Sequence, residues 1–420
     1  MVKTEFLVIG AGISGLSFAG RINSDDYIIC EADSEIGGYC KTIQQDGFTW
    51  DYSGHFFHFK RPDIEQYLLD HMKDQKIFRV EKETKIYWGN NWIDFPFQKN
   101  IHQLPKQDFI DCIYGLNFRP KIEPKNFKEM LYSKFGEGIS EKFLIPYNEK
   151  LYATNLENLD QNAMGRFFPY ADTDQIIKNF KEPDNNSYNN TFTYPEGGAI
   201  QYVEALAKNV DAEKIFLNER IISIDLKQKI ATTNHRKINY QHLVSSAPLT
   251  KLAEITNLEC NRNYFSYNKV LVFNVGFDKK GIEKMHWAYF PQRDICFYRV
   301  GFYDNIMAQD RLSMYVEIGL SSTDELSNAM INEYKDQILL DLQKVGLVSD
   351  HKLVSWHSIV MDPAYVHITQ DSIKETQHIK NILQNYNAHS IGRYGSWTYC
   401  SIEDNIIEAW ELADNFNVLL

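Results

Sequence analysis

Three glycines close to the start of the chain, Gly10, Gly12 and Gly15, have the spacing of a phosphate-binding turn. An apolar run at residues 5–9 precedes them, and residues 16–22 repeat apolar side chains at helical spacing. Such glycines allow a tight turn, a close approach of backbone to a pyrophosphate and close packing of helix on strand. Glu31 ends the next apolar run, where its carboxylate can accept hydrogen bonds from a ribose. This pattern predicts a strand–turn–helix that binds a dinucleotide. Its neighbours in the same site are expected to be Ile13, Ser14 and Ala32.

A second glycine pair, Gly37 and Gly38, follows the acid, and Gly54 precedes His55. Glycine lets the backbone lie close against a ligand, and a domain that binds NAD does not need this second contact. A plain glycine turn is the alternative. The two-part pattern resembles the FAD fingerprint of the superfamily that contains the amine oxidases and the UDP-galactopyranose mutases. The resemblance implies FAD as the cofactor, with Tyr39, Gly54 and His55 beside it.

Composition and charge disfavour several classes of partner. The 420 residues carry a net charge of −12 without a dense run of lysine or arginine, so simple electrostatics disfavour nucleic acid and anionic membranes. No stretch reaches the ~18 apolar residues of a membrane span, and the chain opens with a predicted core strand, so we expect a cytoplasmic protein. No two cysteines are spaced as Cys-x-x-Cys, which is typical of reduced thiols and argues against a zinc site. The cysteines are Cys30, Cys40, Cys112, Cys260, Cys296 and Cys400.

Hydrophobic periodicity places these motifs in an α/β fold. Residues 80–98 alternate as a hairpin, residues 100–180 repeat with a helical period, and strand-like runs dominate residues 270–360. A helix over residues 402–414 is expected to close the cofactor domain. We therefore predict a Rossmann-like FAD-binding domain with an inserted helical lobe and an antiparallel β-sheet substrate domain. The predicted boundaries are residues 1–75, 190–262 and 385–420 for FAD binding, 100–189 for the lobe, and 76–99 with 263–384 for the sheet.

Five further blocks narrow the resemblance to the UDP-galactopyranose mutase family, in particular its eukaryotic-type branch. They lie at residues 92–100, 145–152, 286–291, 297–299 and 393–399, in the family's order and approximate spacing, and extend the resemblance over nearly the whole chain. The resemblance implies a redox-neutral mutase that interconverts pyranose and furanose forms of a UDP- or dTDP-linked sugar. FAD, reduced by NAD(P)H or another external reductant, would attack the sugar through N5 and form a covalent adduct while the sugar ring opens and recloses.

The resemblance also implies a role for individual residues. Arg299 and Arg166 match the arginines that hold the diphosphate, and a guanidinium suits this role because its planar fork pairs with phosphate oxygens. Arg166 aligns only with a one-residue gap. His55 matches the histidine of a loop that moves with the redox state of the flavin. The matching substrate contacts are Tyr289, Tyr365 and Tyr399 for the phosphates, Asn148, Tyr152 and Asn189 for the flap and sugar, and Phe95 and Gln98 for uracil. The further cofactor contacts are Ile221, Arg393 and Ser401.

Plainer interpretations remain open. Arg299, in a predicted strand, is also compatible with a salt bridge, His55 with the cap of a turn, and the tyrosines with simple packing. Asn189 lies in a polar run, residues 182–190, that is equally typical of a solvated loop. We expect Arg299→Ala to lose on the order of 10² or more in kcat/KM, because each hydrogen bond to a charged group contributes roughly 1.5–3 kcal/mol, while FAD content and melting temperature stay near wild type.

Departures from the family pattern leave the base and sugar open. The family's uracil-side tyrosine is Phe95 here, its flap tryptophan is Tyr152, and a proline expected after Tyr365 is Val366. The alternative function is an FAD-dependent oxidoreductase of the amine oxidase type, and a third is a flavoprotein that binds a nucleotide sugar without converting it. A homodimer is a further possibility. We see no cluster of metal-ligand spacing.

Overall fold

The apolar run at the start of the chain becomes a central strand of the first sheet in the computed structural model, which describes residues 1–185 and 190–418. β1 (Val2–Ile9) pairs in parallel with β2 (Tyr27–Cys30) on one side and β12 (Lys237–Ser245) on the other. The remaining strands of this sheet are β9 (Ile215–Phe216), β10 (Ile221–Asp225), β11 (Ile230–Thr233) and β18 (Ala388–Ser390). The predicted Rossmann-like core is confirmed.

Alternate residues of β1 enter two separate cores, because side chains along a strand point to opposite faces. Phe6 and Val8 pack with α1 (Ile13–Ala19), α2 (Pro62–Asp70), α7 (Ile200–Ala207) and α13 (Ile402–Asn417). Leu7 and Ile9 pack with α8 (Leu249–Ile255) and α11 (Gln370–Gln384). α11 therefore packs on the first sheet, whereas the predicted boundary at residue 385 grouped it with the second sheet.

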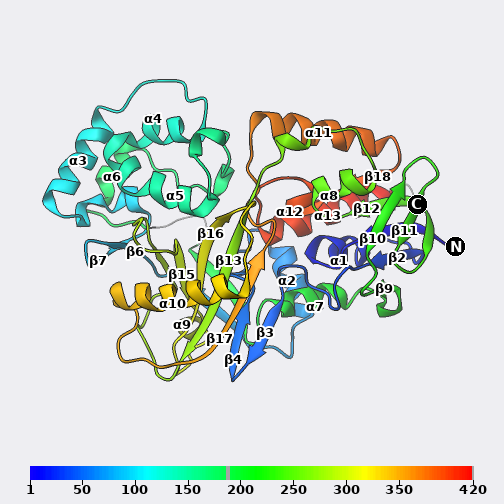
Figure 1. The fold of residues 1–420 in the computed structure, drawn as a ribbon, viewed down its shortest axis with the longest axis horizontal. Coiled ribbons are helices and arrows are strands. Elements are labelled where there is room, and N and C mark those ends of the chain that lie inside the picture. The colour runs from blue at the N-terminus through cyan, green and yellow to red at the C-terminus, as the bar shows by residue number, and fades with distance from the viewer. Residues whose placement is uncertain (186–189, 419–420) are drawn as a thin grey trace.

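α1 and α13 lie far apart in the sequence and side by side in the fold (Figure 1). Leu16 of α1 and Ala409 and Ala413 of α13 are fully buried in their shared core. Beyond α1, Arg21 Nε lies 2.8 Å from the Asp414 carboxylate. The two helices share this face of the first sheet with α2 and α7.

The second sheet has the strand order β17-β13-β16-β15-β14-β6-β7. Its strands are β6 (Thr84–Trp88), β7 (Asn91–Asp94), β13 (Asn268–Phe277), β14 (Trp287–Tyr289), β15 (Arg299–Phe302), β16 (Ser313–Ser321) and β17 (Leu353–Met361). The hairpin predicted in residues 80–98 forms β6 and β7. All neighbours are antiparallel except β6 and β14, which are parallel. α10 (Asn328–Lys344) packs on one face.

The helical lobe stands at the end of the molecule away from both termini (Figure 1). It contains α3 (Lys106–Asn117), α4 (Phe127–Ile139), α5 (Ile145–Tyr152) and α6 (Thr173–Asn179). α4 bends at Gly136, whose φ is 71°. A Cβ atom at Gly136 would lie 2.0 Å from the carbonyl oxygen of Gly115 in α3, so the close packing of these helices requires glycine there.

Two short ribbons and two one-turn helices complete the connections. β3 (Thr42–Gln45) pairs with β4 (Phe48–Asp51), and β5 (Ile77–Glu81) pairs with β8 (Thr191–Pro195). The chain therefore leaves for the lobe and returns from it through adjacent strands. The one-turn helices are α9 (Tyr303–Ile306) and α12 (Gly392–Gly395). Within the described ranges, no helix has both the length and the apolar character needed to cross a membrane.

Candidate active site

A cavity of about 690 Å³ lies where the first sheet, the second sheet and the helical lobe meet. It begins at the carboxyl ends of β1 and β2, the place where open α/β sheets bind their ligands. Gly12 comes from the turn after β1, Asn148 from α5 and Arg299 from β15, and all three line the cavity. One space is thus shared by the regions for which we predicted cofactor and substrate contacts.

Most predicted cofactor residues line this cavity. They are Gly10, Gly12, Ile13, Ser14, Glu31, Ala32, Gly37, Gly38, Tyr39, Gly54, His55, Ile221, Arg393 and Ser401. Gly15 does not line it. A Cβ atom at Gly15 would lie 1.9 Å from the Gly10 carbonyl oxygen, so Gly15 serves the packing of α1 on the turn.

Gly12 of the first turn and Gly38 of the second glycine pair lie close together in the cavity wall. A Cβ atom at Gly12 would lie 3.7 Å from the Gly38 Cα, an ordinary contact distance, so the turn itself leaves room for a side chain. The Glu31 carboxylate accepts hydrogen bonds from the backbone N–H groups of Ala11, at 2.7 Å, and Asp33, at 2.9 Å. These bonds fix the carboxylate at the end of β2 and leave lone pairs for a ribose.

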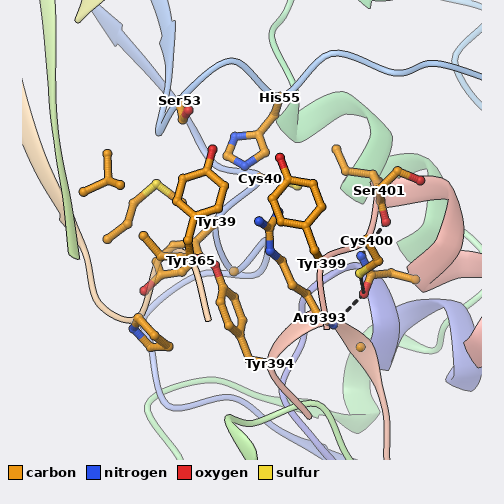
Figure 2. Close-up of a pocket in the computed structure, with 18 of the residues that line it drawn as sticks. Tyr39, Cys40, Ser53, His55, Tyr365, Arg393, Tyr394, Tyr399, Cys400 and Ser401 are labelled. Carbon is orange, nitrogen blue, oxygen red and sulfur yellow. Dashed lines mark hydrogen bonds between the residues drawn. The ribbon is translucent and has the colours of Figure 1, made fainter. Parts of the chain in front are cut away.

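Arg393, Tyr399 and His55 gather around one end of the cavity, as Figure 2 shows. The Arg393 guanidinium carbon lies 5.1 Å from the ring centre of Tyr365 and 4.9 Å from that of Tyr399. Two buried nitrogens here, Arg393 Nε and His55 Nδ1, have no hydrogen-bond partner among the described residues. Burial, with a smaller contribution from Arg393, lowers the pKa of His55 to about 4, so its imidazole is neutral at pH 7.

These features fit FAD. Orphaned polar nitrogens in a cavity are the groups that a bound molecule satisfies. The glycine backbone of the first turn suits the pyrophosphate, Glu31 suits the ribose, and Arg393 with His55 suits the polar edge of a flavin ring. The residues present thus suit the pyrophosphate, a ribose and one edge of the flavin ring.

Aromatic residues, most of them tyrosines, also gather around Arg299 in the cavity wall. Tyr289 and Arg299 are direct neighbours across β14 and β15. Tyr365 and Tyr399 stack with their ring centres 5.8 Å apart, and Phe95 lies 5.3 Å from Tyr289. Burial raises the pKa of Tyr289 to about 12, so its hydroxyl remains a hydrogen-bond donor at neutral pH. All five residues line the cavity.

Arg299 is also one half of a buried ion pair. Its Nε and Nη2 donate to the two carboxylate oxygens of Glu317, at 2.7 and 2.6 Å, across neighbouring strands β15 and β16. The Arg299 side chain is 19% exposed and that of Glu317 1%. Ser53 Oγ donates to the same carboxylate. The salt-bridge interpretation of Arg299 is therefore realised, together with its place in the cavity.

Three of the predicted substrate or catalytic residues lie elsewhere, and a fourth is not described. Arg166 is surface-exposed and forms an ion pair with Asp404 of α13, outside the cavity. Gln98 is fully buried and donates to the Pro169 carbonyl. Tyr152 is buried in the helical lobe, with its ring 5.9 Å from that of Tyr365. Asn189 falls outside the described residues.

The position of Arg166 corrects the prediction of a direct phosphate contact in this conformation. The neighbouring Phe167 packs edge-on against Tyr399, at 5.1 Å between ring centres. The ion pair with Asp404 and the ring contact with Tyr399 hold the segment that carries Arg166 against the C-terminal part of the chain. The guanidinium is therefore directed to Asp404 rather than to the cavity. The one-residue gap needed to align Arg166 with the family already indicated that its match was weaker than that of Arg299.

Sequence reasoning missed several residues of the cavity, among them Glu317, Lys82 and Tyr147. Glu317 left a signal, since it is the one charged residue in the apolar run of residues 312–320. Lys82 Nζ lies 5.4 Å from the ring centre of Phe95, and burial lowers its pKa to about 7. Tyr147 is 5.1 Å from Tyr289 between ring centres and precedes Asn148 on α5. A search for lone polar residues inside apolar runs would have found the first of these.

Comparison with known proteins agrees with this architecture. The sequence matches the family described as flavin containing amine oxidoreductase over residues 13–357, most of the chain. The chain belongs to this family. Protoporphyrinogen oxidase 2 of Arabidopsis thaliana is 20% identical over 409 residues, which covers 80% of this chain and 79% of that protein. A corticosteroid-binding protein of Candida albicans is 33% identical over 92 residues, 20% of this chain and 18% of that protein.

Solved structures share the fold over almost the whole chain. A crystal structure of reduced UDP-galactopyranose mutase superposes with a TM-score of 0.91 at 24% identity, covering 99% of this chain and 96% of that one. Putrescine oxidase bound to putrescine gives a TM-score of 0.66 at 14% identity, covering 99% of each chain. At these identities the likeness establishes the fold. The resemblance to the mutase and amine oxidase superfamily inferred from the sequence is confirmed, and the assignment to a eukaryotic-type branch stays a prediction.

Proposed function

We propose that this protein is a flavin-dependent, redox-neutral mutase that interconverts the pyranose and furanose forms of a UDP- or dTDP-linked sugar. The observation that supports this most is the composition of the cavity wall. Arg299 and Lys82 line the same cavity as Tyr289, Tyr365 and Tyr399, in a protein whose net charge is −12. Local cations and hydroxyl donors of this kind are what a diphosphate needs, because long-range attraction is absent.

The same wall is poorly suited to a cationic amine. An amine substrate gains from aromatic faces and free carboxylates, and Lys82 repels it in its protonated form, which with a pKa of about 7 is present in part of the molecules at pH 7. The carboxylate of Glu317 is already engaged by two bonds from Arg299. An anionic substrate is therefore the better electrostatic match for this part of the cavity.

Each group of side chains has a task in the proposed reaction. The bonds to Glu317 use Nε and Nη2 of Arg299, so Nη1 retains donors for a phosphate oxygen. The buried tyrosines keep their protons at pH 7 and donate to the remaining oxygens, which stabilises the diphosphate as it leaves the sugar. His55, neutral beside the cofactor residues, can exchange hydrogen bonds without adding charge. When bound in its reduced form, FAD supplies the nucleophile for the anomeric carbon.

The test is product analysis with the reduced holoprotein. The protein is reduced with dithionite or NAD(P)H without oxygen and incubated with UDP-galactopyranose, UDP-galactofuranose or the dTDP analogues, and the nucleotide sugars are separated by chromatography. We expect interconversion by the reduced protein and none by the oxidised protein. Arg299→Lys should lose most of the rate, whereas Arg293→Lys, a conservative change at an exposed arginine, should retain it. Unchanged nucleotide sugars with fully reduced, correctly folded protein would contradict the proposal.

An oxidase is the second candidate function, because a relative that matches most of the chain is a protoporphyrinogen oxidase. In an oxidase the substrate reduces the flavin and oxygen reoxidises it, so turnover consumes oxygen. Oxygen uptake with protoporphyrinogen or with amines, measured on the same preparation, separates the two functions. Uptake without any change to nucleotide sugars would favour the oxidase, and binding of nucleotide sugars without either reaction would indicate a binding protein.

A further inference from the structure

The Lys150 ammonium lies in a cage of backbone carbonyls. Its Nζ donates to the carbonyl oxygens of Phe290 at 2.9 Å, Gln292 at 3.0 Å and Ile295 at 2.9 Å, and also to that of Phe297. Four backbone carbonyls around one cationic centre resemble the oxygen shell of a bound monovalent cation. The side chain of Lys150 thus brings a cationic group from α5 into the carbonyl cage of this loop.

The carbonyl cage favours the charged form of the lysine. Burial lowers the pKa of Lys150 to about 7. The four carbonyls oppose this shift because they only accept hydrogen bonds, and an ammonium donates three whereas a neutral amine donates two. Deprotonation would leave buried carbonyls without donors, which is costly.

The cage joins the β14–β15 connection to α5, and both elements carry residues of the cavity wall. The carbonyls belong to the connection between β14 and β15, whose ends are Tyr289 and Arg299. Lys150 belongs to α5, which also carries Tyr147 and Asn148 into the cavity. The ammonium therefore holds both ends of the connection against one helix.

The backbone of α5 is also seated closely on the second sheet. A Cβ atom at Gly319 of β16 would lie 2.0 Å from the carbonyl oxygen of Lys150. Gly319 is two residues beyond Glu317, the partner of Arg299. Three elements, α5, the β14–β15 connection and β16, thus meet around Lys150.

We propose that Lys150 is a positioning residue whose ammonium acts as a built-in monovalent cation. It fixes the β14–β15 connection against α5 and so sets the spacing of Tyr289 and Arg299 from Tyr147 and Asn148. Removal of the side chain leaves an oxygen cage that K⁺ or NH₄⁺ can occupy. The consequence for nucleotide binding rests on the proposed function, whereas the consequence for folding does not.

The experiment compares Lys150→Ala, which empties the cage, with Lys150→Met, which fills the space of the side-chain stem and leaves no room for an ion. Melting temperature and UDP affinity are measured for the FAD-loaded proteins in choline, sodium, potassium and ammonium chloride at equal ionic strength. In choline chloride we expect both variants to melt lower than wild type and to bind UDP on the order of tenfold more weakly, because the wall residues are misplaced. Potassium and ammonium should restore Lys150→Ala in part and leave Lys150→Met unchanged.

Arg293→Ala is the matched control. Arg293 lies in the same connection and pairs with Glu149 of α5, but its side chain is 69% exposed. An exposed ion pair contributes little, so this variant should behave as wild type in every salt. Lys150→Gln, whose amide can still donate to the carbonyls, replaces Lys150→Ala in the comparison if the alanine variant is insoluble, and it should bind UDP more weakly than wild type.

Two results would overturn the proposal. One is a Lys150→Ala protein that melts and binds UDP as wild type does in choline chloride. The other is recovery that is equal in all salts, or equal for Lys150→Met, since the cage would then have no role in cation binding. If wild type itself binds no UDP, the proposed function fails, and the role of Lys150 is decided by the recovery of the melting temperature alone.

Discussion

Replacing Arg299 by alanine removes a diphosphate ligand and one partner of a buried ion pair at the same time. Glu317, 1% exposed, would keep its carboxylate without the guanidinium that neutralises it. Removing one partner of a buried pair costs about 3–5 kcal/mol, since an uncompensated charge stays behind. The buried pair therefore corrects the expectation from the sequence that Arg299→Ala melts near wild type, because the substitution costs stability as well as activity.

The size of the loss can be converted into a melting temperature. The entropy of unfolding is about 2.1 cal/mol/K per residue, which gives about 0.9 kcal/mol/K for a 420-residue chain treated as one cooperative unit. The melting temperature of Arg299→Ala should then fall by roughly 3–6 °C. UDP affinity should fall on the order of a hundredfold, because each hydrogen bond to a charged group contributes roughly 1.5–3 kcal/mol.

A double-mutant cycle separates the two effects. Arg299→Ala, Glu317→Gln and the double variant are melted by circular dichroism, and their UDP affinities are measured by calorimetry. Because the double variant buries no lone charge, it should recover most of the melting temperature without recovering UDP binding. A double variant that melts as low as Arg299→Ala, or an Arg299→Ala protein that melts as wild type, would refute the role given to the pair.

Three further predictions concern other parts of the molecule. Gly12→Ala should keep the fold of the protein without FAD and lose FAD binding, because its Cβ has room in the turn and stands where a pyrophosphate would approach. Gly15→Ala should lower both the melting temperature and FAD binding, since its Cβ would lie 1.9 Å from the Gly10 carbonyl oxygen. Equal melting of the two cofactor-free variants would contradict this. Burial lowers the pKa of His286 to about 4 from an ordinary 6.5, and its Nδ1 accepts from the Glu83 N–H at 2.9 Å, so its contribution to stability is present above pH 6.5 and lost as the pH falls toward 4. The melting advantage of wild type over His286→Asn should therefore shrink between pH 7.5 and 5, and a constant difference would argue against a buried neutral histidine. Arg166→Ala should change UDP affinity by less than about threefold, because Arg166 pairs with Asp404 outside the cavity; a loss as large as that of Arg299→Ala would show that its segment moves onto bound nucleotide.

Local patterns in the sequence were enough to predict the cofactor side of the cavity. The glycine spacing from Gly10 to Gly15 and the acid at Glu31 depend on residues close together in the chain, and the turn they form is dictated by backbone sterics. Hydrophobic periodicity also predicted the strands of the two sheets and the helices of the lobe, since a strand or helix that buries one face repeats apolar residues at its own period. These features survive in the structure with their expected order.

The pairing of Arg299 with Glu317 could only be listed as an alternative, without its partner. The two residues meet because β15 and β16 pair in one register, and a shift by one residue would turn Glu317 to the opposite face. The carbonyl cage around Lys150 is still harder to predict from the sequence. Its ligands are backbone carbonyls, and the conformation of residues 290–298 that aims them at one point leaves no pattern in side-chain types. Arg166 was misplaced because its position depends on how the lobe packs against α13.

The packing of α1 against α13 has a consequence for biosynthesis. Ribosomes make about 5–20 residues per second, so roughly 20–80 s pass between the synthesis of α1 and that of α13 in a chain of 420 residues. During this time the nascent chain holds the glycine turn and the apolar face of α1 without the helix that covers it. Arg393, near the same end of the chain, is also still absent from the cavity. FAD supplied during translation therefore meets an incomplete site, so we expect stable FAD binding only after α13 has been made.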